Sequence, residues 1–339
     1  MKPTIIVLAV LGLMRCTEAR LTLAEVQAAE WEAYKAEFNK TYDEEQDPLR
    51  RQVFEDNKQI IDEHNARFAQ GKETYEMGVN QFTDFLEDEF NGNINGMLSD
   101  DIANLGLFHG VSVHLDDNDV HETETELETD NDHVDWRKLG AVTPVQHQGH
   151  FNNSWAFAAA GAVESREYLV TGKLVPLSKQ NLVDCCRSKH RRTLSALKCI
   201  KKMGGIDTEA SYHYRGKAHR CHYKKKHAGA VVSKIYQSRP GDENSLAHNV
   251  AKGPVAAVIS REALRFYRRG VFHNPRCGQT PDYAVLVVGY GYGENSGDYW
   301  ILKTSLGTAW GEQGYLRLAR NRQNLCGISN RAYFPIVSK

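Results

Sequence analysis

The sequence predicts an α+β protein in which helical segments precede a strand-rich region. Apolar residues recur at three- and four-residue steps between positions 25 and 91, which is typical of helices. The alanine-rich segment at 154–173 is the strongest helix signal, with Asn152 and Asn153 as candidate N-caps and Gly172 as its end. Short β-rich segments punctuated by glycine follow at 284–290, 299–303 and 315–318. This order implies a domain with two lobes.

The N-terminus has the features of a secretory signal peptide. Lys2 precedes an apolar run from Ile5 to Met14, and the small residue Ala19 offers a cleavage site. The run is too short to span a bilayer, and no later stretch is apolar enough to do so. We therefore expect a removable signal over 1–19, a mature chain without a membrane span, and an extracellular or lysosomal location.

Charge divides the chain into two opposed halves. Residues 1–131 contain 10 Lys and Arg against 29 Asp and Glu, whereas residues 132–339 contain 32 against 14. The acidic, weakly apolar stretch 115–132 is typical of an exposed linker, where processing proteases cut. The two halves are expected to attract each other while joined, and the basic half alone is expected to attract polyanions.

Several sequence motifs carry a family resemblance. The C-terminal section contains VDWRKLGAVTPVQHQG, SWAF, LVPLSKQNLVDC, MGGIDTEASYHY, YAVLVVGYG and WGEQGY. Two further motifs lie upstream. The first is spread over residues 46–65 and consists of Gln46, Arg50, Val53, Phe54, Asn57, Ile61 and Asn65. The second is short and consists of Gly78, Asn80, Phe82 and Asp84. These sections resemble papain-like cysteine proteases of the cathepsin L type and their inhibitory propeptide.

The resemblance implies a papain-like fold, with a helical lobe and a β-barrel-like lobe that meet at a cleft. It implies an inhibitory helical propeptide over 20–114, an acidic linker over 115–132 and a peptidase-like domain over 133–339. Such a propeptide binds the protease domain of its own chain. We expect a monomer.

The catalytic positions of the family are replaced in this chain. The resemblance places Ser154 at the nucleophile, Tyr283 at the base and Thr304 at the orienting asparagine, with Leu306 for the shielding tryptophan. The oxyanion glutamine remains as Gln148. A serine requires a base, and a phenol that titrates near 10 is a poor one at acidic or neutral pH. We therefore predict a pseudoprotease with no functional catalytic residue.

Three other interpretations stay open at this point. Ser154 could support residual hydrolase activity, with His147 or His150 as a replacement base. The propeptide motifs could make the chain a regulator of active cathepsins. A glycan could occupy either of two sequons, at Asn39 and Asn152.

The cysteine count favours a disulfide framework in an oxidising compartment. Of seven cysteines, Cys16 lies in the signal peptide. The resemblance implies the pairs Cys185–Cys221 and Cys277–Cys326, which leaves Cys186 and Cys199 as a possible third pair. The family's glycine-rich subsite segment is absent from the interval CCRSKHRRTLSALKCI at 185–200.

Two basic runs are either solvated faces or a site for an acidic glycan, nucleic acid or acidic protein surface. Histidines interleave with them and add positive charge below about pH 6.5. Histidine spacing is irregular, so we expect no metal and no cofactor. The candidate polyanion-binding residues are Arg187, Lys189, Arg191, Arg192, Lys198, Lys201 and Lys202, then Lys217, Arg220, Lys224, Lys225 and Lys226.

Overall fold

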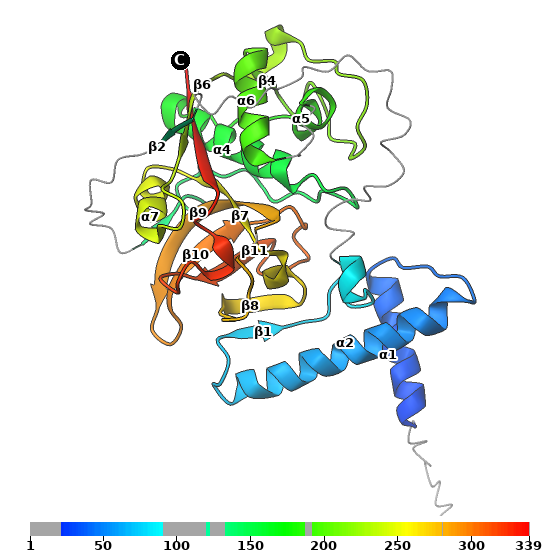
Figure 1. Ribbon diagram of the computed structural model, residues 1–339. Helices are drawn as coiled ribbons and strands as arrows, with labels where there is room; N and C mark the ends of the chain where they lie inside the picture. Colours follow the sequence, from blue (N-terminus) through cyan, green and yellow to red (C-terminus); the bar gives the residue numbers. More distant parts are fainter. Residues whose placement is uncertain (1–21, 91–119, 123–132, 187–191, 280, 339) are drawn as a thin grey trace, which may run out of the picture. The chain divides into compact units, whose positions relative to one another are not determined.

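The computed structural model describes residues 22–90, 120–122, 133–186, 192–279 and 281–338 (Figure 1). The chain divides into two compact units, residues 1–51 and 52–339. The predicted signal peptide lies outside the described residues, as does most of the predicted acidic linker. In the described ranges, no helix is long and apolar enough to cross a membrane.

The first unit contains helix α1 (Leu23–Glu37) and the start of helix α2 (Gln46–Ala69). A capping box starts α1, because the Thr22 hydroxyl accepts from the Glu25 N–H and the Glu25 carboxylate accepts from the Thr22 N–H. Asp47 accepts hydrogen bonds from the Lys35 ammonium at 2.7 Å and the Trp31 indole at 3.1 Å. The bond from Lys35 is the main reason that the pKa of Asp47 is lowered.

In the second unit, the remainder of α2 leads into strand β1 (Tyr75–Met77). The expectation of helix throughout 25–91 was therefore only partly right. The chain turns at Gly71, whose φ of 70° suits glycine. The Asn65 side chain then exchanges two hydrogen bonds of 2.9 Å with the backbone of Met77, which fixes β1 beside the helix.

The second unit is built on a sheet in the order β1-β8-β11-β10-β9-β7-β12-β6-β2, with β3 paired to β9. A separate pair joins β4 to β5. The segments predicted as strands at 284–290, 299–303 and 315–318 are confirmed within β9, β10 and β11. The bounds of the strands that follow β1 in the described residues are β2 (Val120–Glu122), β3 (Val134–Asp135), β4 (Ile206–Asp207), β5 (Ala228–Ala230), β6 (Val232–Gln237), β7 (Val255–Ile259), β8 (Tyr267–Phe272), β9 (Tyr283–Gly293), β10 (Gly297–Lys303), β11 (Tyr315–Ala319) and β12 (Ala332–Val337).

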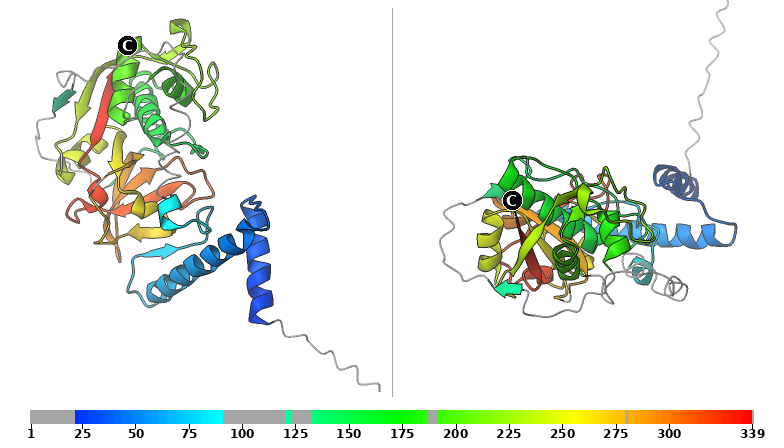
Figure 2. Two further views of the ribbon diagram at one scale, coloured as in Figure 1. Left: turned by 45° about the vertical axis from the view of Figure 1, so that its right-hand side comes forward. Right: turned by 90° about the horizontal axis from the view of Figure 1, so that it is seen from above.

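The described part of this unit also contains α4 (Ser154–Thr171), α5 (Lys179–Cys185), α6 (Thr193–Met203) and α7 (Glu243–Ala251). Short 3-10 turns occur at Lys225–His227, Arg261–Leu264 and Leu325–Gly327. Figures 1 and 2 show α4, α5 and α6 together at one end of the unit, and β8, β10 and β11 at the other. Each end has its own hydrophobic core. The predicted α+β class with two lobes is confirmed.

Helix α4 lies close to the sheet because its residues at the contact are small. A Cβ at Gly161 would lie 2.9 Å from a methyl carbon of Leu286 on β9. The helix ends at Gly172 in the left-handed conformation, as predicted. Asn153 is the N-cap, one of the two predicted candidates, but its side chain makes no capping hydrogen bond. It donates instead to the Tyr214 hydroxyl at 2.9 Å and the Gly216 carbonyl at 2.8 Å.

Candidate functional site

Ser154 is the first residue of α4 and lies against the start of β9. Its side chain is buried, and its Oγ accepts a hydrogen bond of 3.3 Å from the backbone N–H of Ala284. In the described part of the chain, no imidazole or carboxylate hydrogen-bonds to this hydroxyl. The contact positions Ser154 without polarising its O–H bond toward a base.

Tyr283, the first residue of β9, directly precedes Ala284, whose N–H bonds to this serine. The side chain is completely buried, and burial raises its pKa to about 12. Its hydroxyl lies 2.9 Å from the Oγ of Ser305 and also accepts from the Ser305 N–H at 3.3 Å. The phenol is therefore neutral throughout the acidic and neutral pH range.

Gln148 belongs to the same hydrogen-bonded chain. Its Oε1 accepts from the Ser305 hydroxyl at 2.6 Å, and its Nε2 donates to the Phe151 carbonyl at 2.7 Å. Ser305 thus joins Tyr283 to Gln148. The sequence interpretation missed Ser305, although it immediately follows Thr304 in the motif that carried the resemblance.

Thr304 is directed elsewhere. Its hydroxyl donates to the Gly314 carbonyl at 2.9 Å and accepts from the Leu306 N–H at 3.3 Å. The structure therefore brings Gln148 and Tyr283 together through Ser305, and Thr304 makes no hydrogen bond with either. Leu306 is buried in the core of the strand-rich lobe.

The two loop histidines considered as replacement bases are His147 and His150. His147 Nδ1 accepts from the Gly149 N–H at 3.0 Å. Burial, and then the neighbouring His150, lower the pKa of His147. Neither histidine is a hydrogen-bond partner of Ser154.

A buried ionic cluster underlies these residues, and the sequence did not indicate it. Lys179 Nζ lies 2.7 Å from Glu164 Oε1, and Thr143 Oγ1 donates to Glu164 Oε2 at 2.7 Å. Lys303 donates to the Thr143 carbonyl at 2.7 Å. Burial raises the pKa of Glu164, but Lys179 and Lys303 outweigh that effect and the net shift is downward.

A cavity of about 260 Å³ opens beside Ser154. Asn152, the second candidate glycosylation site, is half-buried and also lines it. The first candidate, Asn39, is exposed in the turn after α1. Part of the cavity wall is the first turn of α6.

Disulfide bonds are present, as the even cysteine count predicted. They join Cys185 to Cys221, Cys186 to Cys199 and Cys277 to Cys326. Because Cys185 and Cys186 are adjacent, the first two bonds connect the end of α5 both to α6 and to the segment 213–227. We call this segment the basic loop.

The candidate basic residues differ in how far their side chains are exposed to solvent. Lys198 is buried, and Lys201 is half-buried. Arg187, Lys189 and Arg191 lie outside the described residues. The exposed candidates are Arg192, Lys202, Lys217, Arg220, Lys224, Lys225 and Lys226.

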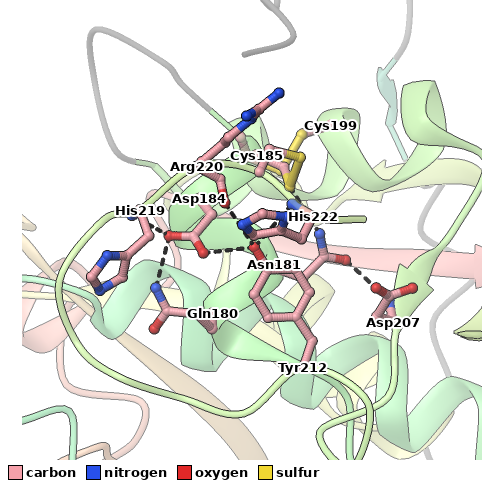
Figure 3. Close-up of a disulfide and its surroundings, with 12 residues drawn as sticks. Gln180, Asn181, Asp184, Cys185, Cys199, Asp207, Tyr212, His219, Arg220 and His222 are labelled. Atoms are coloured by element: carbon pink, nitrogen blue, oxygen red, sulfur yellow. Dashed lines mark hydrogen bonds between the residues drawn. A yellow bond between two sulfur atoms is a disulfide. The ribbon is translucent and has the colours of Figure 1, made fainter. Parts of the chain in front are cut away.

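The backbone of the basic loop is held from the inside (Figure 3). Buried Asp184 accepts from the His219 N–H and the Tyr212 hydroxyl, both at 2.6 Å. Gln180 accepts from the Arg215 N–H at 2.7 Å. Figure 3 shows the His219 ring and the Arg220 guanidinium pointing away from Asp184. The Asp184 carboxylate thus fixes the backbone of the basic loop, while the His219 and Arg220 side chains face outward.

Comparisons with known proteins agree with this architecture. Residues 131–336 match the papain family cysteine protease model, and residues 31–90 match the cathepsin propeptide inhibitor domain. A cathepsin L-like peptidase of Aedes aegypti is 40% identical over 94% of this chain and 95% of its own length. Testin-2 of Mus musculus is 36% identical over 91% of this chain and 92% of its own.

A solved structure shows the same fold. The digestive procathepsin L 3 of Tenebrio molitor larval midgut superposes with a TM-score of 0.80 and 35% sequence identity. The alignment covers 91% of this chain and 99% of that one. The resemblance therefore extends through both the propeptide and the peptidase-like domain.

Proposed function

The chain belongs to the papain family of cysteine proteases, and from this premise we propose that it acts by binding a polyanion and does not hydrolyse peptides. We expect it to do so outside the cell or in the lysosome. The binding proposal rests on the basic loop, which exposes several lysine and arginine side chains. A disulfide bond and hydrogen bonds to Gln180 and Asp184 hold the backbone of this loop in place.

The contacts of Ser154 support the absence of hydrolysis. Attack on a carbonyl requires a base that removes the serine proton within hydrogen-bond reach. The Ser154 hydroxyl accepts a backbone N–H instead, and the phenol of Tyr283 has a pKa of about 12. Gln148, which could stabilise an oxyanion, is bonded to Ser305 and Phe151.

The arrangement of the basic loop supports polyanion binding. Each lysine or arginine fixed near its neighbours adds to a local positive potential, which salt weakens. Disulfides to adjacent cysteines hold the loop and α6 close to the same helix end. A preformed cationic surface loses little conformational freedom when a sulfated glycan or nucleic acid binds.

Retention on immobilised heparin tests this proposal. We expect the full chain to bind at low salt and to elute as salt rises. The triple variant Lys224→Gln, Lys225→Gln, Lys226→Gln elutes at clearly lower salt. The matched control neutralises three exposed lysines elsewhere, Lys138, Lys173 and Lys234. Equal elution of the two triple variants would contradict a site at the basic loop.

Residual hydrolase activity at Ser154 is a second candidate, because this serine lines a cavity. A fluorophosphonate probe labels serines activated as nucleophiles. We expect no labelling of the full chain at this residue. Labelling that Ser154→Ala removes would favour the hydrolase candidate.

Regulation of active cathepsins is a third candidate. It is favoured by the asparagine contacts that hold the propeptide segment, such as Asn57 Nδ2 to the carbonyls of Thr83 at 2.8 Å and Phe85 at 3.0 Å. Adding the full chain to an active cathepsin L-like enzyme tests it. Loss of peptide hydrolysis at micromolar concentration would support this candidate, and unchanged hydrolysis would exclude it.

A further inference from the structure

The buried ionic cluster of Glu164, Lys179 and Lys303 contains more positive than negative charge. The side chains of Glu164 on α4 and Lys179 at the start of α5 are only 1% and 4% exposed. Lys303, at the end of β10, supplies a second ammonium. Burial lowers the pKa of Lys303 to about 8, the charge of Glu164 raises it, and the charge of Lys179 lowers it. One carboxylate therefore faces two ammonium groups.

The carboxylate of Glu164 is already committed to other donors. Its Oε1 accepts from Lys179 Nζ at 2.7 Å and from the Leu177 N–H at 2.8 Å, and its Oε2 accepts from the Thr143 hydroxyl at 2.7 Å. Lys303 donates to neutral acceptors, the Thr143 carbonyl at 2.7 Å and the Thr143 hydroxyl at 3.0 Å. In the described ranges, no carboxylate forms a salt bridge with Lys303. An ammonium away from water without a counterion is unfavourable.

Both ammonium groups also have hydrogen-bonding capacity left. A lysine ammonium has three N–H donors. Within the part of the chain that the structure describes, Lys179 Nζ has Glu164 as its acceptor, and Lys303 Nζ has the two oxygen atoms of Thr143. At least one N–H group of each lysine is therefore available to a further acceptor.

A small cavity of about 20 Å³ lies at this cluster, and Glu164, Lys179 and Lys303 all line it. A cavity of this size holds a single occupant of about the size of a water molecule. Gln146 and Phe157 also line it and, like Lys303, are only half-buried, so small ions can reach it from this side. This cavity is separate from the larger one beside Ser154, which extends to α6.

The charge and the size of the cavity together limit what it can hold. A water molecule would accept from the lysines but would leave the positive charge uncompensated. Sulfate, phosphate and carboxylates carry negative charge but contain several heavy atoms and exceed the space. The excess charge is present at acidic and neutral pH, because Lys303 keeps its proton below about pH 8. A single-atom anion meets both requirements.

We propose that this cavity binds a chloride ion between Lys179 and Lys303. The ion accepts N–H groups from both ammonium groups and, together with the Glu164 carboxylate, makes the cluster electrically neutral. The two lysines come from α5 and β10, so only the folded chain brings them together. Chloride therefore stabilises the fold. This site is independent of polyanion binding at the basic loop.

Urea unfolding of the full chain tests the proposal. The measurements are made at about pH 6, where both lysines are protonated, while sodium chloride replaces sodium gluconate at constant ionic strength. Gluconate has the same charge but is too large for the cavity. We expect the urea midpoint to rise with chloride and then to level off. At about 100 times the dissociation constant of chloride, the folding equilibrium constant rises about 100-fold.

Lys179→Met is the most informative variant. It removes one ammonium and leaves Glu164 with Lys303, so the cluster is neutral without an anion and the chloride dependence disappears. Lys303→Met reaches the same charge from the other side and is expected to give the same result, so the test does not require both variants to fold. The matched control is Lys173→Met, which replaces an exposed lysine and retains the full dependence.

The variant Lys224→Gln, Lys225→Gln, Lys226→Gln separates this site from the basic loop. It is expected to keep the wild-type chloride dependence while it loses heparin retention. A wild-type midpoint that does not rise with chloride would overturn the proposal. Chloride dependence that persists in Lys179→Met or Lys303→Met, or that disappears in the basic-loop variant, would overturn it as well, because chloride would then act elsewhere on the protein.

Discussion

Tyr283 and Ser305 form a buried hydrogen-bonded pair at the position where the sequence resemblance predicts the catalytic base. The phenol is fully buried, and its hydroxyl forms one link of a chain that ends at Gln148. A tyrosine at this point contributes packing and hydrogen bonding. Its proton is retained across the range in which papain-type enzymes need a base.

Replacing Tyr283 by phenylalanine tests this structural role. The ring still fills the space, but the Ser305 N–H loses its acceptor, so the free energy of unfolding falls by about 1 to 2 kcal/mol. Urea denaturation measures the change. Tyr292→Phe is the control, because Tyr292 is 63% exposed and its substitution leaves the stability unchanged. Equal stability of wild type and Tyr283→Phe would show that the buried hydroxyl contributes nothing.

Lys303 gives a pH-dependent prediction at the same scale. Burial lowers the pKa of its ammonium from 10.5 to about 8. Between these pH values the unfolded chain binds a proton that the folded chain has released. The stability of wild type relative to Lys303→Met therefore rises with pH across this window, by about 3 kcal/mol in total, and is constant below it.

Urea unfolding of both proteins between about pH 7 and 10 measures this difference. Using the difference removes the contribution of tyrosines, which titrate in both proteins. A wild-type to variant gap that does not change with pH would contradict burial of this ammonium.

Among the elements, the end of α5 organises the cationic surface. Cys185 and Cys186 fasten the basic loop and α6 to one point, and Asp184 bonds the loop backbone from inside. The loop is therefore expected to keep its shape only while these covalent and hydrogen-bonded anchors are present.

Removing one disulfide tests this dependence. The double variant Cys185→Ser, Cys221→Ser keeps every positive charge but frees the loop, so heparin elution shifts to lower salt. Folding is followed by circular dichroism. A Cys277→Ser, Cys326→Ser variant removes a disulfide outside the loop and retains wild-type elution if it folds. Unchanged elution of the Cys185–Cys221 variant would show that charge alone governs binding.

Helix α2 provides a prediction for the propeptide segment. Asn57 donates to two loop carbonyls and accepts from Arg265, so Asn57→Ala leaves several buried groups unpaired. We expect a loss of about 3 kcal/mol in the local stability of residues 75–90, measured by hydrogen exchange. Gln59→Ala, on the same helix, is the control and leaves exchange unchanged.

For the whole molecule, the sequence predicted helix α4 and segments within strands β9, β10 and β11, because periodicity and glycine placement report local structure. It did not predict strand β1, which depends on distant partners: Asn65 on α2 and Gly270 on β8. The hydrogen bond from Ser305 to Gln148 joins residues that lie more than a hundred positions apart in the sequence. Glu164, Lys179 and Lys303 lie in separate segments, and the sequence did not indicate that their charges meet in one buried cluster.

Only part of the candidate site was predicted, because its hydrogen bonds join residues that are distant in the sequence. Motif resemblance located Ser154, Tyr283 and Gln148, but no motif records that Thr304 bonds to Gly314. The burial of Lys198 in α6 likewise depends on tertiary packing, so a count of basic residues could not separate it from exposed Lys202.

Peptide hydrolysis by the wild type and Ser154→Ala, across about pH 4 to 8, tests the central claim most directly. The chain is first treated to remove the propeptide, and an active cathepsin L-like enzyme is assayed alongside. We predict turnover roughly 10⁶-fold below that enzyme, as expected when a nucleophile, base and orienting group are lost together, with no difference between the two proteins. Turnover that Ser154→Ala abolishes would contradict the account.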